Sequence, residues 1–252
     1  MRASPAAALI EVFDSFQGEG PKVGEPSVFV RTAGCPLRCS YCDTVYSYQS
    51  GPEFEVRSLE HGIIDVLANP ISARDLDAAL PGSLLRGVRW LSLTGGEPLL
   101  FPDFAAELCS MARARGLSTL LETAGIHPEG LSRVLPALDH LSMDWKLPST
   151  LAGQDHGDLH LACLSAALEP GVETSVKMVL TSRVGAAEMD SALERLAGFA
   201  DHVLLVLQPV TPCLEETEAL PRQDMIRHGR AAMDQGFRVL LLPQVHRLLE
   251  LP

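Results

Sequence analysis

Residues 34–44 read Gly-Cys-Pro-Leu-Arg-Cys-Ser-Tyr-Cys-Asp-Thr and place Cys35, Cys39 and Cys42 within eight positions. The stretch directly follows a β-branched, apolar run at residues 27–31, which predicts a strand. Three closely spaced thiolates on one loop can wrap an iron-sulfur cluster, and they leave one iron of a four-iron cube without a protein ligand. The sequence therefore predicts a [4Fe-4S] cluster with one coordination position open to another molecule.

Zinc and a disulfide are the competing interpretations of these cysteines. A closed structural zinc site uses four ligands, and the sequence shows no second cysteine pair or Cys-His arm. A disulfide would leave the third cysteine unexplained, and a chain of 252 residues is too large to need a disulfide framework. The other three cysteines stand apart in the sequence and are expected to be packing residues: Cys109, Cys163 and Cys213.

Outward from this loop, short aliphatic runs alternate with amphipathic helical patterns. The runs that predict strands are 27–31, 90–94, 119–122, 140–144, 173–180, 203–207 and 238–242. The helical patterns are 73–80, 101–115, 186–199 and 222–235. Such alternation is typical of parallel strands covered by helices, so we predict an α/β fold with catalytic groups at the carboxyl ends of the strands.

Residues 1–252 are interpreted as a single domain in which two stretches depart from this alternation. Residues 47–57 and 148–172 are rich in turn formers or irregularly polar, so we interpret both as insertions. The second contains His156 and His160, which would share one face of a helix. With no cysteine near them, we expect a solvated loop or short helix there rather than a second metal site.

Composition excludes two broad classes of partner. The chain carries 32 acidic and 20 basic residues, a net charge of -12, so its surface should repel a phosphate backbone, and we expect no nucleic acid partner. The longest apolar stretches are far shorter than the roughly 20 residues that cross a bilayer, and the N-terminus does not read as a signal peptide. We therefore expect a cytoplasmic protein with no membrane association.

A second motif, Thr94-Gly95-Gly96-Glu97-Pro98, directly follows the run at 90–93. Two glycines expose backbone groups where a ligand amine and carboxylate can approach, and Glu97 adds an acceptor. A lone motif of this kind would be only a turn. Together with the cysteine spacing, however, it resembles the radical S-adenosylmethionine (SAM) superfamily. The resemblance implies an open partial (β/α)6-type barrel with inserted loops, in which S-adenosylmethionine chelates the open iron and is split to a 5′-deoxyadenosyl radical.

Several further motifs are similar to those of one group in that superfamily, the 7-carboxy-7-deazaguanine synthase (QueE) family. They span nearly the whole chain: residues 13–20 (Phe-Asp-Ser-Phe-Gln-Gly-Glu-Gly), 29–35, 43–44, 121–125, 142–149, 207–209 and 244–247 (Gln-Val-His-Arg). The resemblance implies a carbon-nitrogen lyase that contracts the ring of 6-carboxy-5,6,7,8-tetrahydropterin, releasing ammonia, on the route to queuosine and other deazapurines. It also implies Mg²⁺ as a cofactor and a homodimer. A low-potential cluster leads us to expect a flavodoxin-like electron donor.

The same resemblance assigns roles to individual residues. Cys35, Cys39 and Cys42 would hold the cluster. Thr44 would also be catalytic, as the residue that binds Mg²⁺. S-adenosylmethionine would be bound by Tyr41, Cys42, Asp43, Gly96, Glu97, Ser142, Asp144, Lys146, Gln208, Pro209 and Val210. The pterin would be bound by Phe16, Gln17, Gly18, Glu19, Arg31, Thr94, His246 and the carboxylate of Pro252.

Simpler interpretations of these residues stay open from sequence. Thr44 taken alone is a turn residue or helix cap, Gln17 and Glu19 are loop residues, Arg31 is a surface strand residue, and His246 ends a core helix. Two other functions also stay open: a radical-activating enzyme that acts on a protein glycine, and a non-catalytic iron-sulfur electron carrier.

Overall fold

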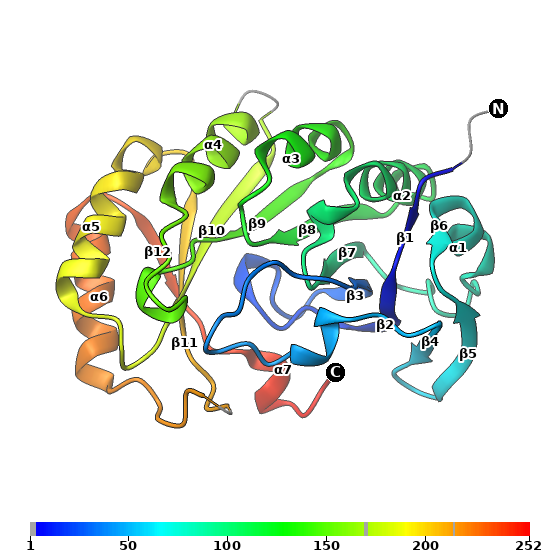
Figure 1. Cartoon of the computed structure of the whole chain (residues 1–252), viewed down its shortest axis with the longest axis horizontal. Helices are drawn as coiled ribbons and strands as arrows, with labels where there is room; N and C mark the ends of the chain where they lie inside the picture. The colour runs from blue at the N-terminus through cyan, green and yellow to red at the C-terminus, as the bar shows by residue number, and fades with distance from the viewer. Residues whose placement is uncertain (1–3, 169–170, 214) are drawn as a thin grey trace.

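The computed structural model describes residues 4–168, 171–213 and 215–252. Its centre is a ten-stranded sheet with the order β12-β11-β10-β9-β8-β7-β3-β2-β4-β5. Figure 1 shows the sheet curved into an arc with helices on its outer side. The two edge strands of the described sheet do not pair, so the barrel is open, and the predicted α/β fold is confirmed.

Seven strands of this sheet are parallel. They are β3 (Pro26–Thr32), β7 (Trp90–Gly95), β8 (Ser118–Thr123), β9 (His140–Asp144), β10 (Glu173–Leu180), β11 (Leu204–Pro209) and β12 (Arg238–Leu241). Each corresponds to a predicted run. The helices are α1 (Ala73–Ala79), α2 (Pro102–Ala114), α3 (Pro128–Val134), α4 (Gly157–Leu168), α5 (Ala186–Leu196), α6 (Arg222–Asp234) and α7 (Val245–Leu248).

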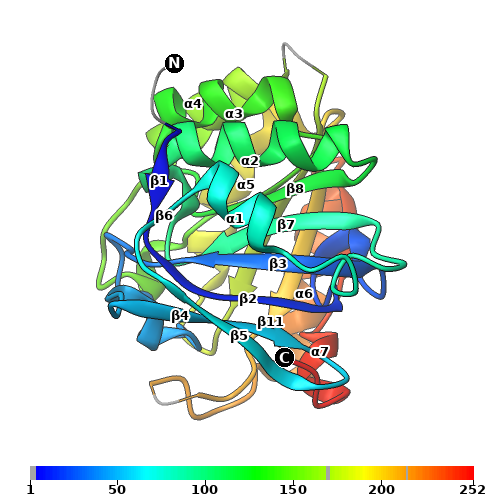
Figure 2. The same ribbon diagram turned by 90° about the vertical axis from the view of Figure 1, so that its right-hand side faces the viewer.

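Other strands lie outside the predicted alternation. β2 (Leu9–Phe16) pairs antiparallel with β3 and parallel with β4 (Glu53–Ser58), which forms a hairpin with β5 (Gly62–Ala68). Figure 2 shows these strands extending the sheet beyond β3. β1 (Ala6–Ala7) and β6 (Ile71–Ser72) form a separate two-stranded pair. The predicted insertion at 47–57 thus contains most of β4.

The sequence predicts that the segment 148–172 departs from the strand-helix alternation, but it contains the helix α4, which follows β9 and precedes β10. Its sequence is apolar on most sides, so it lacks the one-sided pattern that reveals an amphipathic helix. The sequence predicts a solvated loop or a short helix around His156 and His160, and His160 does lie in a helix, α4. The segment is not solvated at this point, because the His160 side chain is fully buried and its ring lies 4.9 Å from that of Trp145. Residues 169 and 170 of the segment lie outside the described residues.

Alternation along the parallel strands sorts their side chains into two layers. Leu121, Leu141 and Leu205 are fully buried in the main hydrophobic core, together with Leu108 of α2 and Leu193 of α5. The intervening strand positions, such as Glu122 and Lys177, line a cavity on the inner face. None of the described helices is long and apolar enough to cross a membrane.

The loop between β2 and β3, residues 17–25, reaches across the inner face of the sheet. Its base is closed by the hydrogen bond from the Gln17 backbone N–H to the Glu25 carbonyl, at 2.9 Å. Lys22 forms an ion pair of 2.7 Å with Glu173 at the start of β10, and Glu19 pairs with Lys177 further along that strand. The loop therefore carries its polar residues into the concave side of the sheet.

Candidate functional site

A cavity of about 1040 Å³ opens on the concave face, at the carboxyl ends of the parallel strands. It is lined by the cysteine loop, the 17–25 loop, β7 to β11 and the last residues of the chain. Cavities at this end of a parallel sheet are the usual place for cofactor chemistry.

The three cysteines of the sequence motif all line the cavity as free, half-buried thiols. The side chains of Cys35 and Cys39 pack against an apolar cluster of Leu37, Ala124, Ile126 and Leu151. Burial in this setting raises the pKa of the Cys35 and Cys39 thiols, so each would lose its proton on binding a metal. Three thiols that line one partly apolar cavity supply the ligand type and number of a [4Fe-4S] cluster that leaves one iron without a protein ligand.

The glycine motif brings the end of β7 against the cysteine loop. The Gly96 N–H donates to the Thr32 carbonyl at 2.9 Å, and the Glu97 N–H donates to the Gly34 carbonyl at 2.7 Å. A β-carbon on Gly96 would overlap the Gly34 carbonyl oxygen. Gly95 has a φ of +121°, where a side chain is also disfavoured. Glycine is therefore required here for the close approach of two backbones, and both glycines line the cavity.

Glu97, predicted to bind S-adenosylmethionine, does not line the cavity. Its carboxylate is fully buried and accepts hydrogen bonds from Thr123 Oγ1 at 2.8 Å, the Ala124 N–H at 2.8 Å and the Leu99 N–H at 3.0 Å. These contacts join the ends of β7 and β8. In the structure Glu97 supports the glycine motif from behind.

Asp144 and Lys146 lie at the end of β9 beside Tyr41 of the cysteine loop. Lys146 Nζ donates to Asp144 Oδ2 at 2.6 Å and to Tyr41 Oη at 3.1 Å. Burial opposes the charged form of Lys146, but the negative charge of Asp144 outweighs it and raises the pKa of Lys146 well above its ordinary value. Lys146 therefore keeps a positive charge near the cysteines.

Two other residues predicted to bind S-adenosylmethionine are not brought to the cavity. Ser142 lies next to Gly20 of the 17–25 loop, and the cavity wall does not include it. Pro209 lies between Gln208 and Val210, which do line the cavity, as expected where successive strand residues face opposite sides.

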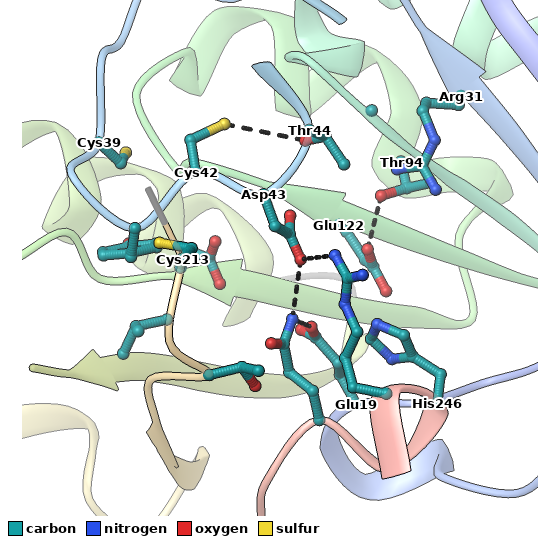
Figure 3. A pocket seen from close by; sticks show the side chains of 18 of the residues that line it. Glu19, Arg31, Cys39, Cys42, Asp43, Thr44, Thr94, Glu122, Cys213 and His246 are labelled. Atoms are coloured by element: carbon teal, nitrogen blue, oxygen red, sulfur yellow. Dashed lines mark hydrogen bonds and ion pairs between the residues drawn. The ribbon is translucent and has the colours of Figure 1, made fainter. Parts of the chain in front are cut away.

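Three of the predicted pterin-binding residues, Gln17, Arg31 and Thr94, lie in the wall of the cavity around Glu122, on the side away from Cys39 (Figure 3). Gln17 Nε2 donates to Glu122 Oε1 at 2.9 Å, and Thr94 Oγ1 donates to Glu122 Oε2 at 2.6 Å. Burial raises the pKa of Glu122. Arg31 lies nearby with its Nε bound to Glu11 Oε1 at 2.8 Å. Amide, hydroxyl, carboxylate and guanidinium groups thus converge in one polar wall.

The C-terminal segment lies over the 17–25 loop and contacts the cysteine loop (Figure 3). Gln244 Nε2 donates to Glu19 Oε1 at 2.8 Å and to Asp43 Oδ2 at 3.1 Å, and Arg247 donates to Asp43 Oδ2 at 3.0 Å. Burial opposes ionisation of Asp43, but its bond to Arg247 lowers the pKa below the ordinary value. The side chain of Asp43 is therefore engaged by this segment.

His246 and Pro252 are also brought to the cavity by this segment. The His246 ring lies so close to the Gly18 backbone that a β-carbon on Gly18 would overlap its Nδ1. The Pro252 carbonyl accepts a hydrogen bond from Ser15 Oγ at 3.2 Å.

Comparisons with known proteins agree on one family. The family model of the radical SAM superfamily matches residues 29–196. The chain is 33% identical to the 7-carboxy-7-deazaguanine synthase of Methanothermobacter thermautotrophicus, covering 97% of this chain and 98% of that protein. It is 34% identical to that of Geobacter sulfurreducens, covering 98% of both. The chain belongs to the 7-carboxy-7-deazaguanine synthase family. The crystal structure of QueE from Escherichia coli shares the fold, with a TM-score of 0.62, 21% identity and coverage of 94% of this chain and 93% of that one.

Membership of this radical SAM family implies the [4Fe-4S] cluster and S-adenosylmethionine as cofactors, as the sequence motifs predict. The structure brings the three cysteines and the residues predicted to bind the pterin into one cavity. It also adds cavity residues that sequence reasoning missed: Glu11, Glu122, Lys177, Gln244 and Arg247. Glu122, Gln244 and Arg247 stood inside recognised motifs, and Lys177 was the lone charge within the apolar stretch Ser175–Leu180. A single buried charge in such a strand is the signal that could have identified it.

Proposed function

We propose that this chain is a 7-carboxy-7-deazaguanine synthase that contracts the ring of 6-carboxy-5,6,7,8-tetrahydropterin and releases ammonia. The observation that carries the proposal is that the cysteine triad and a wall of pterin-type recognition groups share one cavity. The full-length similarity to synthases of that name supports it.

Cys35, Cys39 and Cys42 would hold the cluster in the loop that follows the carboxyl end of β3. When bound, the cluster and S-adenosylmethionine supply the one-electron chemistry that removes a hydrogen atom from the substrate. Lys146, which stays charged, and Asp144 lie where they can bind the polar groups of the cofactor, and Gly96 exposes its backbone on the same side. These residues fix the cofactor relative to the cysteines.

The opposite wall suits a pterin that carries a carboxylate. Arg31 offers a cationic fork to the carboxylate, because Glu11 occupies only its Nε and leaves both terminal nitrogens for a ligand. Glu19, Gln17 and Glu122 present acceptors to the N–H groups of the pyrimidine edge. Since these groups are already hydrogen-bonded to protein partners, they would meet the substrate in fixed orientations.

Thr44 is our proposed protein ligand for Mg²⁺. It follows Asp43 and precedes the short 3-10 helix Val45–Tyr48, and its hydroxyl makes no capping bond to that helix. It lines the cavity, with Oγ1 3.8 Å from the Cys42 sulfur. Mg²⁺ binds oxygen and commonly keeps water and substrate ligands, so one hydroxyl beside a substrate carboxylate would be sufficient protein contact.

The test is anaerobic reconstitution followed by assay with 6-carboxytetrahydropterin, S-adenosylmethionine, dithionite and Mg²⁺. We expect 7-carboxy-7-deazaguanine and ammonia as products. Cleavage of S-adenosylmethionine without carboxydeazaguanine would contradict the proposed substrate and favour an activating enzyme. No cleavage by the cluster-loaded, reduced protein would favour an electron carrier.

Cysteine variants check the cluster itself. We expect Cys39→Ser to lose bound iron and sulfide, and Cys213→Ser to retain them, although Cys213 also lines the cavity. Equal iron content in both variants would contradict the assignment of the triad. We also propose a flavodoxin-like electron donor, because the cluster needs a low-potential reductant, and a homodimer, on the strength of the family resemblance. Sedimentation would measure the assembly directly.

A further inference from the structure

A ring of hydrogen bonds and one ion pair, between Asp144 and Lys177, runs around the cavity. Its two ends, Tyr41 and Asp43, flank Cys42 in the sequence. From Tyr41 it passes to Lys146 at 3.1 Å and to Asp144 at 2.6 Å. It continues from Asp144 to Lys177 at 3.2 Å and from Lys177 to Glu19 at 2.5 Å. It returns from Glu19 through Gln244, at 2.8 Å, to Asp43, at 3.1 Å. Residues 158 positions apart in sequence are thereby held in one network.

Lys177 is the member of this ring that contacts both walls of the cavity. Its ammonium group is shared by Glu19, on the proposed pterin side, and Asp144, on the proposed S-adenosylmethionine side. The residue is only 8% exposed. Burial opposes its charge, but Asp144 and Glu19 together raise the pKa of Lys177 above its ordinary value. Lys177 is therefore a charged residue with little access to water.

Sharing of this kind makes the two carboxylates compete for one cation. A ligand that donates hydrogen bonds to Glu19 weakens the ion pair between Glu19 and Lys177. The ion pair between Lys177 and Asp144 then becomes stronger. Asp144 also binds Lys146, so its hold on Lys146 weakens in turn. Lys146 becomes freer to bind the anionic group of a second ligand. Because the side chains of Lys177, Glu19 and Asp144 are largely buried, such charge interactions are weakly screened.

We propose that Lys177 is a positioning residue that couples pterin binding to S-adenosylmethionine binding, so that each ligand tightens the other. The inference rests on the proposed function, which supplies the two ligands. The effect is reciprocal, because a coupling free energy between two sites acts equally on both affinities. Without the pterin, S-adenosylmethionine would bind more weakly. Less of it would then be cleaved when no substrate is present.

The test measures binding without turnover. The dissociation constant of S-adenosylmethionine is determined by equilibrium dialysis with the cluster-loaded, oxidised protein, with and without saturating 6-carboxytetrahydropterin. We expect the pterin to tighten binding of S-adenosylmethionine about tenfold in the natural protein. In Lys177→Met we expect this ratio to fall below about twofold, since the shared cation is absent.

Arg57→Met is the matched control. Arg57 also lines the cavity, but its side chain is half exposed, pairs with Glu55 at 3.7 Å and stands outside the ring. It should keep the natural ratio. Removing Lys177 leaves a buried carboxylate without its cation, which can prevent folding. The double variant Lys177→Met with Glu19→Gln removes both charges and leaves Asp144 paired with Lys146. Because Glu19 is itself a proposed pterin contact, the pterin affinity of this variant is measured first, and the ratio, determined with the pterin site saturated, should also fall below about twofold.

The outcomes separate the two proposals. A natural protein that binds the pterin with no effect on S-adenosylmethionine, or a tenfold ratio retained in both Lys177 variants, overturns the coupling and leaves the proposed function standing. Loss of the ratio in Arg57→Met as well would overturn the specific role of Lys177. A natural protein that binds no pterin overturns the proposed function itself.

Discussion

Glu11 and Arg31 are cross-strand partners in the antiparallel pair of β2 and β3, and the carboxylate of Glu11 holds Arg31 Nε at 2.8 Å. Both side chains line the cavity and are largely buried. The guanidinium also lies over the ring of Phe13, 5.4 Å from its centre. The pair fixes the direction of the guanidinium before any ligand binds.

Arg31→Lys should therefore raise KM for the pterin by about tenfold or more, because an ammonium cannot provide two parallel hydrogen bonds to a carboxylate. The affinity for S-adenosylmethionine should stay within about twofold, since Arg31 lies on the other wall. Steady-state kinetics and a binding assay check the two quantities. Glu11→Gln keeps an acceptor for Arg31 and should have a smaller effect on KM. An equal loss of affinity for both ligands would count against the assignment.

The role proposed for Thr44 can be distinguished from that of the neighbouring cysteines by measuring how activity depends on Mg²⁺. Thr44→Ala removes the hydroxyl and should abolish stimulation by Mg²⁺, while iron content remains unchanged because the three thiols are intact. Thr44→Ser keeps the hydroxyl and should keep most of the stimulation. Titration of activity against Mg²⁺ gives the measurement. The same Mg²⁺ response in Thr44→Ala as in the natural chain would refute the magnesium site.

Gly96→Ala tests the close packing of β7 against the cysteine loop. The new methyl group would overlap the Gly34 carbonyl oxygen, so the two backbones must separate. Overpacking of this kind costs about 1–3 kcal/mol, and the shift should also lower iron incorporation. Gly198→Ala is the control, because a β-carbon added there would meet no other atom within 4 Å. Urea unfolding and iron analysis would show whether the two variants differ, and equal stability would contradict the packing argument.

The parts of the fold that could be predicted from sequence are the strands that form short apolar runs and the helices that are apolar on one side only. β7 and β8 read as strands because Leu91, Leu93 and Leu121 stand in short, mostly apolar runs. The helix α4 did not stand out, since apolar residues cover most of its surface. The hairpin of β4 and β5 was also missed, because β5 is an edge strand whose residues are mostly exposed.

The residues of the candidate site also fall into two groups: those that belong to a local sequence motif and those whose contacts depend on the tertiary fold. The cysteine triad and Gly96 belong to short local motifs, and the sequence placed them at one site through the resemblance that these motifs carry; the structure brings all four residues to one cavity. The pairing of Glu19 with Lys177 depends on how the 17–25 loop crosses the sheet, and no local pattern contains that information. The position of Glu97 in its motif predicts a ligand contact, but the structure shows its buried carboxylate joining the ends of β7 and β8, and no local pattern contains that information.

Buried histidine provides a prediction about stability and pH. Burial, with smaller effects from Lys146 and His156, lowers the pKa of His160 to about 3 from an ordinary value of 6.5. Between these values the unfolded chain binds a proton at this residue and the folded chain does not. Lowering the pH from 6.5 toward 3 therefore favours unfolding, with a slope from this one residue of up to about 1.4 kcal/mol per pH unit.

His160→Phe should remove that slope, because phenylalanine does not titrate and can retain the contact with Trp145. The free energy of unfolding, measured in urea at about pH 7.5 and about pH 5, should then fall less on acidification than in the natural chain, by about 1–2 kcal/mol. His61→Gln is the control, since the His61 side chain is 67% exposed in the folded protein and meets water in both states. It should leave the pH dependence unchanged. If His160→Phe loses as much stability between the two pH values as the natural chain, His160 does not stay neutral in the folded state.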